Sequence, residues 1–578
     1  MLLTPPVRTA IEAVGAGAPL AEIGRRLGGE AGTRVFDRLV EVGLFEVQPP
    51  FADQSADHLR DLHAWLGDES PAAGALRELA DALDAYPTPD AGTTRRRELH
   101  HRIRAGFEAV SGQVAGVPLP ARNLFQENAV LTADPVRLGG AGWGPAVADL
   151  HVIHRFLALF QHSTVVRLVA HRVLVDRFGA GTRIGLLELH RELSRMTVDP
   201  DPETTVAELA GLLRPGEPTD PARSTLAEVR WLHRLRQQAL TALWAGPEAT
   251  PDGVTVDPSQ VRRSVEEWPG WVRPAPALAC FVQQVPAADG LRLVLNGVGA
   301  GHGAVRSRVR RLLAKATPDG TDTVDLSVSS PPDPSGCLAE LTGLFGSNVN
   351  LRSPAVGHEI SYPGTVSARP PRQRIPLDEL VVVVDEATPT LHLLRRGDEK
   401  AVRIAHTGMM AGARLPRLAR LLVQLFGDVP NAAAPTTQIF DRPPEHPPRA
   451  VWRSPRLSIG RVTVSRASWR VPADLVPSRP KGVDDAEYLL TLAGWFADHR
   501  IPHRSYVTAT GPDRPPGPVK PVYLDLGNLL LVRLFERLLR EPDAVLVFRE
   551  ALPQLADAPT FGAEGRHVTE YVVEIGPT

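Results

Sequence analysis

The chain of 578 residues carries 64 basic and 66 acidic residues, which leaves a formal net charge of −2. A balance this close to zero excludes a protein held to nucleic acid by its overall field, so any such surface must be a local patch. The only two cysteines, Cys280 and Cys337, exclude a disulfide framework and a cysteine-based zinc site.

No apolar run reaches the length of a membrane span, and no charged and then apolar leader opens the chain. The sequence therefore predicts a cytoplasmic protein without a membrane contact. Four stretches differ in pattern and together predict an α+β protein. We expect a winged-helix subdomain at 1–50, a mainly helical region at 51–245, a Pro/Gly-rich connector at 246–275 and an α+β region at 276–578.

Helix signals open the chain. Thr4 is a suitable N-cap and Pro5 a suitable first helical residue, so we predict a helix from there. Two further helices are expected at 19–27 and 32–42, followed by a strand at 43–47. Three helices and a short hairpin strand are typical of a winged helix.

The third of these helices carries Arg34 and Arg38. In DNA-binding relatives this helix enters the major groove, but here Asp37 and Glu41 offset the two cations, which does not favour DNA. From these residues alone, a purely structural subdomain is the remaining interpretation.

Helical spacing continues through most of 51–245, and Gly179 predicts the end of a helix over 165–178. Prolines recur between 247 and 274 and indicate the connector. Beyond residue 276 the apolar period changes from 3.6 to 2 residues. Strands are expected at 380–385, 390–394, 401–405, 462–465, 506–508, 522–524, 545–548 and 571–575, with helices at 415–426, 486–498 and 529–539.

The densest group of candidate residues follows a strand predicted at 291–296. A glycine-rich turn at 297–303 leads into a helix that carries five cations: Arg306, Arg308, Arg310, Arg311 and Lys315. The turn lacks the spacing of a dinucleotide site and the Lys-Ser/Thr of a P-loop, so alone it predicts only a strand-to-helix turn. The cations suit a phosphate backbone or the oxyanion of an acyl ester, and a solvated helix face is the alternative.

A polar run at 346–354 is the second candidate. Asn348, Asn350 and Arg352 are hydrogen-bonding residues in a mostly apolar stretch. They predict either a loop that positions a substrate or an ordinary turn.

Metal and hydrolase motifs are not found in the sequence. His151 and His154 share a helix face, but Asp149 is the only acid close by, so we predict no metal site. There is no Gly-x-Ser-x-Gly elbow and no His-Glu-x-x-His pair.

Short blocks of sequence stand in a definite order over more than 500 residues. They are 3–12, 148–150, 177–179, 186–189, 297–313, 346–354, 375–385, 455–466, 522–528 and 565–571. In this order they resemble the N-terminal, tRNA-dependent glutamylation region of lantibiotic dehydratases. These enzymes begin the dehydration of Ser and Thr in ribosomally made peptides.

The resemblance implies transfer of glutamate from glutamyl-tRNA, as co-substrate and without another cofactor, to Ser or Thr of a precursor peptide. The tetrahedral oxyanion of such an acyl transfer needs a cation, and arginine stays charged and offers forked donors. We therefore expect Arg308 to be catalytic, four cations to contact tRNA and five residues to bind substrate or its leader. The tRNA set is Arg306, Arg310, Arg311 and Lys315, and the substrate set is Asn348, Asn350, Arg352, Arg34 and Arg38.

Two parts of the family have no counterpart in this sequence: a further N-terminal segment with arginines implicated in catalysis, and a separate elimination domain. We therefore expect a split or truncated enzyme whose partners are an elimination protein and a protein that supplies the segment, with a homodimer also open. Two alternatives remain, a peptide aminoacyl-tRNA ligase and a non-catalytic scaffold that binds the leader peptide.

Overall fold

The computed structural model divides the chain into two compact units. The first comprises Met1–Ala129, Thr342–Leu344 and Tyr362–Pro370, and the second comprises Val130–Leu341, Phe345–Ser361 and Pro371–Thr578. The residues described are 4–15, 18–86, 92–113, 124–129, 142–214, 220–245, 248–250, 253–288, 290–316, 336–427, 439–442, 444, 446, 448–511, 520–541, 543–558, 560–562 and 565–576. No described helix is both long and apolar enough to cross a membrane.

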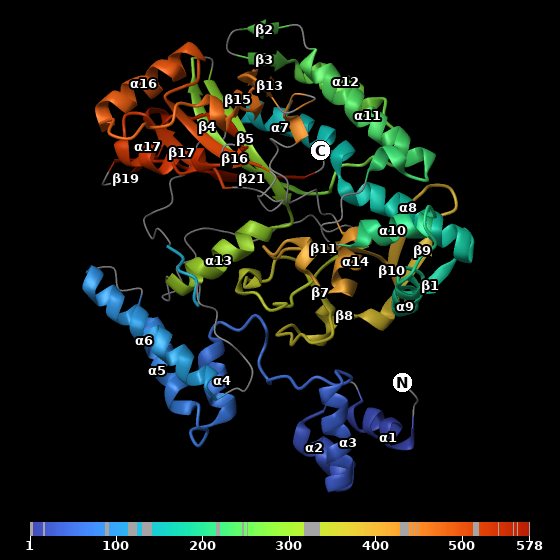
Figure 1. The fold of residues 1–578 in the computed structure, drawn as a ribbon. Coiled ribbons are helices and arrows are strands. Elements are labelled where there is room, and N and C mark those ends of the chain that lie inside the picture. The colour runs from blue at the N-terminus through green and yellow to red at the C-terminus, as the bar shows by residue number, and fades with distance from the viewer. Residues whose placement is uncertain are drawn as a thin grey trace. The chain divides into compact units, whose positions relative to one another are not determined.

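The first unit opens with three short helices, as predicted (Figure 1). They are α1 (Pro5–Val14), α2 (Leu20–Arg26) and α3 (Glu30–Glu41). The strand predicted at 43–47 is wrong, because these residues have no strand partner among the described residues. Instead the amides of Leu44 and Phe45 donate to the carbonyl of Leu39 at 2.8 and 3.2 Å and close the end of α3. Phe45 also stacks on Phe36, with 5.5 Å between ring centroids.

Three further helices complete this unit: α4 (His58–Leu66), α5 (Ala73–Ala85) and α6 (Thr93–Ser111). Asp57 caps the start of α4 by accepting the amide of Arg60. The apolar faces of α5 and α6 meet through Leu79, Leu99 and Ile103, which are almost fully buried. Burial of this stripe, rather than helix propensity alone, stabilises helices of this length.

The second unit contains most of the predicted helical region. Its helices are α7 (Gly144–Leu157), α8 (His162–Phe178), α9 (Leu186–Met196), α10 (Thr205–Leu213) and α11 (Ala227–Trp244). As predicted, α8 ends at Gly179, whose φ of 89° favours glycine. The strand β1 (Arg183–Gly185) follows and pairs with β9 (Leu380–Val384), so this helical region shares a sheet with residues far along the chain.

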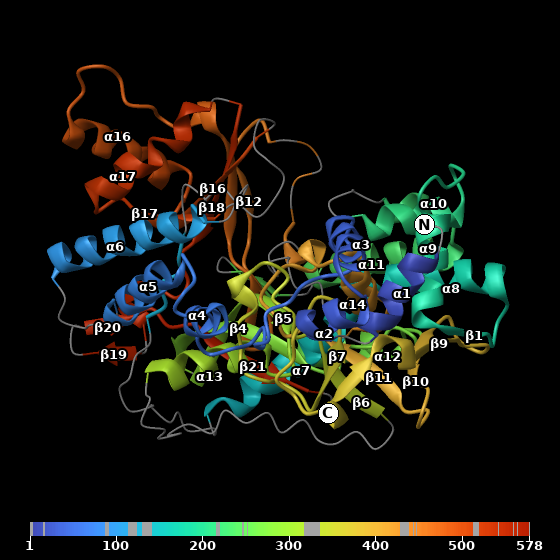
Figure 2. The same cartoon turned by 90° about the horizontal axis from the view of Figure 1, so that it is seen from below.

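The first sheet of this unit has the order β1-β9-β10-β11-β6-β7-β8. It is antiparallel from β1 to β11 and parallel from β11 to β8. The helix α14 (Arg417–Phe426) packs on β10 and β11 (Figure 2). The remaining strands are β6 (Gly336–Glu340), β7 (His358–Ser361), β8 (Arg374–Pro376), β10 (Leu391–Arg395) and β11 (Ala401–Ala405).

The second sheet has the order β2-β3-β13-β14-β5-β4-β21. Its core packs on α7 and α12 (Pro258–Glu266) through side chains such as Phe156 and Val261. Its strands are β2 (Glu248–Thr250), β3 (Gly253–Val256), β4 (Leu278–Ala287), β5 (Gly290–Ala300), β13 (Leu457–Ile459), β14 (Val462–Ser465) and β21 (Tyr571–Ile575). The stretch expected as a connector thus supplies two strands and a helix, and its Pro258 stands at the start of α12, where a proline is tolerated.

The third sheet has the order β12-β15-β18-β16-β17 and carries α16 (Asp485–Asp498) and α17 (Leu529–Phe535). Phe496, Phe535 and Phe548 are fully buried between these helices and the sheet. Its strands are β12 (Trp452–Ser454), β15 (Ser468–Pro472), β16 (Arg504–Thr510), β17 (Val522–Asp525) and β18 (Val545–Glu550), and β19 (Thr560–Gly562) pairs with β20 (Gly565–His567) beside it in sequence. All the strands and helices predicted beyond residue 380 are present, with ends shifted by a few residues.

Candidate functional site

The predicted strand-to-helix element is present, with one correction. Residues 297–300 were expected in a turn, but they extend β5, and the turn itself is confined to 301–303 before α13 (Ala304–Ala316) begins. A Cβ at Gly301 would lie 2.5 Å from that of Ala277, so the close approach of the two strand ends requires glycine. His302 and Gly303 both adopt positive φ, 57° and 75°, and turn the chain into the helix.

A carboxylate of the same chain occupies the start of α13. Glu574 on β21 accepts the amide of Gly303 with its two oxygens at 3.1 and 3.0 Å, and it lies 3.5 Å from the guanidinium of Arg306. The amides at a helix start and the positive end of its dipole attract an anion. Glu574 therefore places a carboxylate of the protein itself at this end of α13, where it engages the amide of Gly303.

The arginines of α13 differ in exposure. Arg308 is half-buried and donates to the carbonyl of Val349 at 3.2 Å, while Arg310 is exposed. Burial lowers the pKa of Arg311, which shares the face of Arg308. Arg306 is 37% exposed beside Glu574. The side chain of Lys315 lies outside the described residues.

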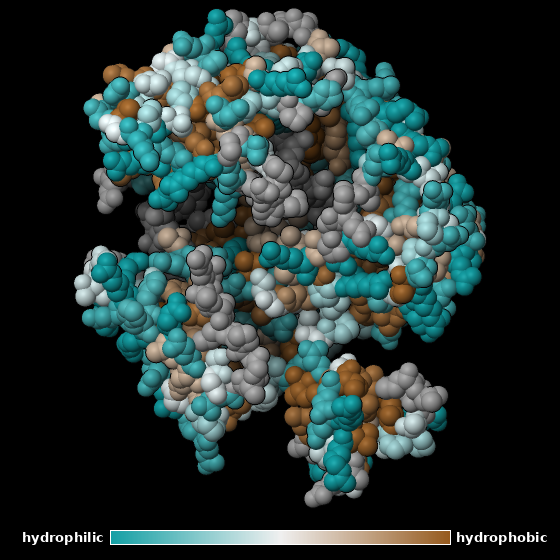
Figure 3. Space-filling model, viewed as in Figure 1, coloured by the Kyte–Doolittle hydropathy of each residue, from teal (hydrophilic) through white to brown (hydrophobic). Residues whose placement is uncertain are grey.

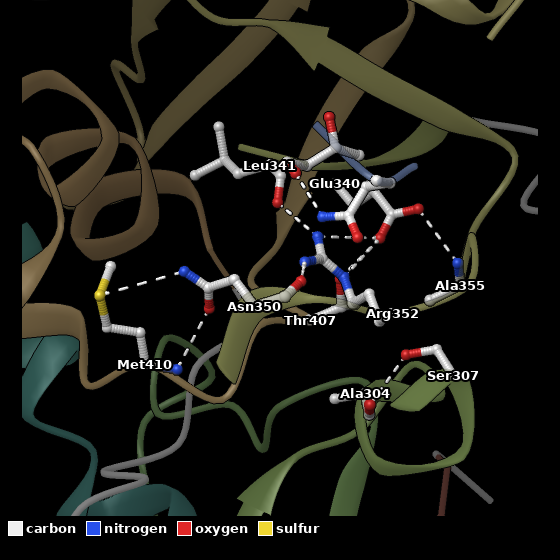
Figure 4. Close-up of polar contacts among 11 residues, drawn as sticks. Ala304, Ser307, Glu340, Leu341, Asn350, Arg352, Ala355, Thr407 and Met410 are labelled. Atoms are coloured by element: carbon white, nitrogen blue, oxygen red, sulfur yellow. Dashed lines mark hydrogen bonds and ion pairs between the residues drawn. The ribbon is translucent and has the colours of Figure 1, made fainter. Parts of the chain in front are cut away.

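The polar run at 346–354 is held by a buried ion pair (Figure 4). Arg352 is 3% exposed, and its Nε and Nη2 both lie 3.3 Å from the carboxylate of Glu340, which is fully buried at the end of β6. The same guanidinium donates to the Thr407 hydroxyl at 2.7 Å and to the carbonyls of Asn350 and Leu341 at 2.8 and 2.5 Å. A buried charge is stable only when it is paired and hydrogen-bonded, as it is here.

Glu340 is satisfied in turn by other donors. The Thr407 hydroxyl donates to it at 2.6 Å and the amide of Ala355 at 3.0 Å. The loop is also tied to the basic helix, because the amide of Ser353 donates to the carbonyl of Ser307 on α13 at 3.0 Å. The ion pair therefore links β6, the loop after β11 and α13 into one arrangement.

Asn350 lies inside this arrangement at 1% exposure. Its side-chain oxygen accepts the amide of Met410 at 3.3 Å. The nearby His406 is also buried, and its Nε2 lies 2.8 Å from the carbonyl of Met410, which makes Nε2 the protonated nitrogen. Burial lowers the pKa of His406, so the imidazole is neutral. Its Nδ1 has no hydrogen-bond partner among the described residues and carries a lone pair.

The structure brings some of the predicted site residues together and not others. Arg308 of α13 contacts the loop at 346–354 through the carbonyl of Val349, and in that loop Asn348 is exposed but Asn350 and Arg352 are buried. Direct binding of substrate by these two stays a prediction, and their described contacts are all within the protein. Arg34 and Arg38 are exposed on α3 in the other unit, where Arg38 pairs with Glu41 at 2.6 Å.

Several residues of this arrangement were not predicted from the sequence. Glu340, Thr407 and Glu574 each stand in ordinary strand or loop sequence, and no local spacing distinguishes them. Only the pairing of β6 with β11, and of β4 with both β5 and β21, brings them beside α13 and its loop. Among the described residues no group of three His, Cys, Asp or Glu side chains is arranged to hold a metal.

Comparison with known proteins gives one family. The family model described as lantibiotic dehydratase, N terminus, matches residues 2–528. The glutamylation domain of TbtB from thiomuracin biosynthesis has a TM-score of 0.80 at 32% identity, and the match covers 100% of this chain and 66% of that chain. The same domain bound to 5′-phosphodesmethylglutamycin also gives 0.80, at 31% identity with the same coverage.

A more distant likeness shows the fold alone. The tRNA-dependent lantibiotic dehydratase MibB from Microbispora sp. 107891 has a TM-score of 0.57 at 18% identity, covering 95% of this chain and 51% of that chain. The chain thus spans just under two thirds of the TbtB chain, at 66%, and about half of the MibB chain. No curated protein sequence matches it.

Proposed function

The chain belongs to the family of lantibiotic dehydratase N-terminal regions, and we propose that it transfers glutamate from glutamyl-tRNA to Ser and Thr side chains of a ribosomally made precursor peptide. The observation that carries the proposal is the match to the TbtB glutamylation domain over 100% of this chain. Elimination of the added glutamate would then complete the dehydration.

The chemistry is an acyl transfer. The hydroxyl oxygen of the peptide attacks the ester carbonyl of glutamyl-tRNA, the new ester bond forms, and the bond to the ribose oxygen of the tRNA breaks. The peptide hydroxyl loses a proton and the ribose oxygen gains one, so no outside reactant is needed. The ester already stores the energy, and the protein must position the two reactants and stabilise the oxyanion.

Arg308 is our candidate for oxyanion stabilisation. Its guanidinium stays charged and is fixed by the carbonyl of Val349, so little reorganisation is needed when negative charge develops. Asn350 and Arg352 then act as positioning residues, because they set the course of the loop that carries Val349. The neutral His406, with its Nδ1 lone pair, is a candidate proton acceptor beside Asn350 and Met410.

The other cations of α13 suit the RNA backbone. Arg310 is exposed, and Arg306 and Arg311 stand on either side of it along the helix, with Lys315 one turn further. Arginine and lysine contacts to phosphates give affinity without reading sequence. Discrimination of the charged tRNA would therefore rest mainly on its glutamyl end.

The first unit is our candidate for the leader peptide. Apolar side chains are exposed on and just after its first three helices, where Figure 3 shows a brown surface. Leu44 and Val47 are 40% and 43% exposed, and Arg34 and Arg38 add cations on α3. A mixed apolar and cationic surface suits an extended or helical peptide with acidic residues.

Mass spectrometry of the peptide tests the proposal. The purified chain is incubated with glutamyl-tRNA and the precursor peptide encoded beside it, with and without the partner proteins. Glutamyl adducts on Ser or Thr are expected, and Arg308→Gln should lower their rate by about a hundredfold or more, as for loss of an oxyanion donor. Arg263→Gln on α12, an exposed arginine outside α13 and the loop at 346–354, is the matched control and should leave the rate unchanged.

The alternatives give different products. A peptide aminoacyl-tRNA ligase would add an amino acid to the C-terminus of the peptide, so the adduct would be an amide there and not a side-chain ester. A scaffold would bind the peptide but give no adduct even with every partner present. Either outcome would refute side-chain glutamylation by this chain.

A further inference from the structure

A cavity of about 370 Å³ lies away from α13, between α9, α10 and α14 of the second unit. Three arginines line it, Arg214 after α10 and Arg417 and Arg420 on the first turn of α14. Of the described residues that line the cavity none is acidic, and its floor is apolar, with leucines from all three helices. Such a volume is within the range of small-ligand sites.

The two arginines of α14 are held with their charges close together. Arg417 donates to the hydroxyl of Thr197 at 2.8 Å, and Arg420 donates to the carbonyl of Ala413 at 3.1 Å. Both partners are neutral, so neither contact offsets the positive charge. Burial and the neighbouring Arg417 lower the pKa of Arg420, which reflects the cost of gathering like charges there.

A histidine completes the wall. His190 on α9 lines the same cavity, and its Nε2 is buried without a hydrogen-bond partner among the described residues. Burial and the charge of Arg417 lower the pKa of His190, so its imidazole is neutral. Buried polar atoms are nearly always satisfied, so this ring nitrogen is a hydrogen-bonding group of the wall that the described residues leave unused.

We propose that this cavity binds a phosphate group through Arg417, Arg420 and His190. Arginine forks match the geometry of phosphate oxygens, and a neutral imidazole can donate one further hydrogen bond. The phosphate has two possible sources, an RNA chain or free phosphate in solution, and nothing in the glutamyl-transfer proposal requires this site.

Inorganic phosphate is the first probe. Titration calorimetry with the full chain, against sodium chloride of equal ionic strength, should show binding of one phosphate. Arg417→Gln and Arg420→Gln should each weaken it by about tenfold or more, as expected for loss of a charge-assisted hydrogen bond. Arg417→Lys keeps the charge and should have an intermediate effect. The matched control is Arg191→Gln, which removes an exposed arginine from α9 outside the cavity lining.

Uncharged tRNA is the second probe and separates the two sources. If RNA supplies the phosphate, the same variants weaken tRNA binding, flatten its salt dependence by about one unit each, and phosphate competes with tRNA. If free phosphate is the ligand, the variants change phosphate binding alone. The proposal is overturned if phosphate does not bind, or if Arg417→Gln, Arg420→Gln and Arg191→Gln bind it equally while circular dichroism shows all three folded.

Discussion

Replacement of Arg352 by methionine tests how the loop at 346–354 is held. Methionine has a similar length but no charge, so Arg352→Met leaves the carboxylate of Glu340 in the interior without its cation. The Thr407 hydroxyl and the Ala355 amide still donate to Glu340. The carbonyls of Asn350 and Leu341 lose their donor at the same time.

The magnitude follows from burial. Removal of one partner of a buried ion pair costs about 3–5 kcal/mol, and the two donors that remain on Glu340 place this case near about 3 kcal/mol. The matched control is Arg183→Met, because Arg183 pairs with Glu399 on the same sheet but both are about half exposed. Loss of an exposed pair costs about 1 kcal/mol or less.

Calorimetry at a fixed scan rate measures the difference. In a unit larger than 250 residues, each kcal/mol of lost stability lowers the melting temperature by less than about 2–4 °C. Arg352→Met should therefore lower the melting temperature by several degrees and Arg183→Met by about one degree. Glu340→Gln in the Arg352→Met background should recover part of the loss, because it removes the uncompensated charge. Equal melting temperatures for Arg352→Met and Arg183→Met would refute the reasoning.

Three further outcomes are expected. Burial lowers the pKa of His154 from 6.5 to about 4, so the folded state keeps the imidazole neutral. The contribution of the neutral imidazole to stability is complete above pH 6.5 and is lost as the pH drops toward 4. His154→Gln should therefore flatten the fall in melting temperature between these two pH values, and an unchanged slope would contradict this. Burial raises the pKa of Cys280 to about 12, so iodoacetamide in mildly alkaline buffer should label this thiol only after denaturation. Mass spectrometry measures the labelling, and a labelled Cys280 in the native protein would count against its buried position. A Cβ at Gly408 would overlap the side-chain oxygen of Asn350, so Gly408→Ala should slow glutamyl transfer. Gly412→Ala is the control, because a Cβ at Gly412 has open space around it and should not change the rate. Equal rates for the two variants would show that the position of Asn350 does not affect the activity.

The sequence predicted elements well where one local pattern decides them. Alternating apolar residues predicted β11 and β14 to the residue, because successive side chains of a strand point to opposite faces of the sheet. The strand expected at 43–47 is absent because local pattern alone does not decide whether a strand forms. A strand forms only against a partner, and here the amides at 44 and 45 find the end of α3 instead. Local pattern cannot show whether a partner exists.

The candidate site also contains residues that local sequence predicts and residues that only long-range pairing brings in. The cations of α13 were predictable, because they lie within three helical turns and any helix there gathers them. Glu340 and Glu574 were not, because each reaches the site through strand pairing over long separations. The buried position of Arg352 also depends on Glu340, since an arginine without that carboxylate would have stayed at the surface.

These long-range contacts fix the position of α13 relative to the loop at 346–354. Arg352 holds the chain at Asn350, one residue beyond Val349, whose carbonyl receives Arg308. The next residue after Arg352 donates to Ser307, which directly precedes Arg308. The ion pair of Arg352 and Glu340 therefore positions the guanidinium of Arg308 from two directions. If Arg308 is catalytic and positioned in this way, Arg352→Met should slow glutamyl transfer even at temperatures where the variant stays folded, and an unaltered rate there would count against that role.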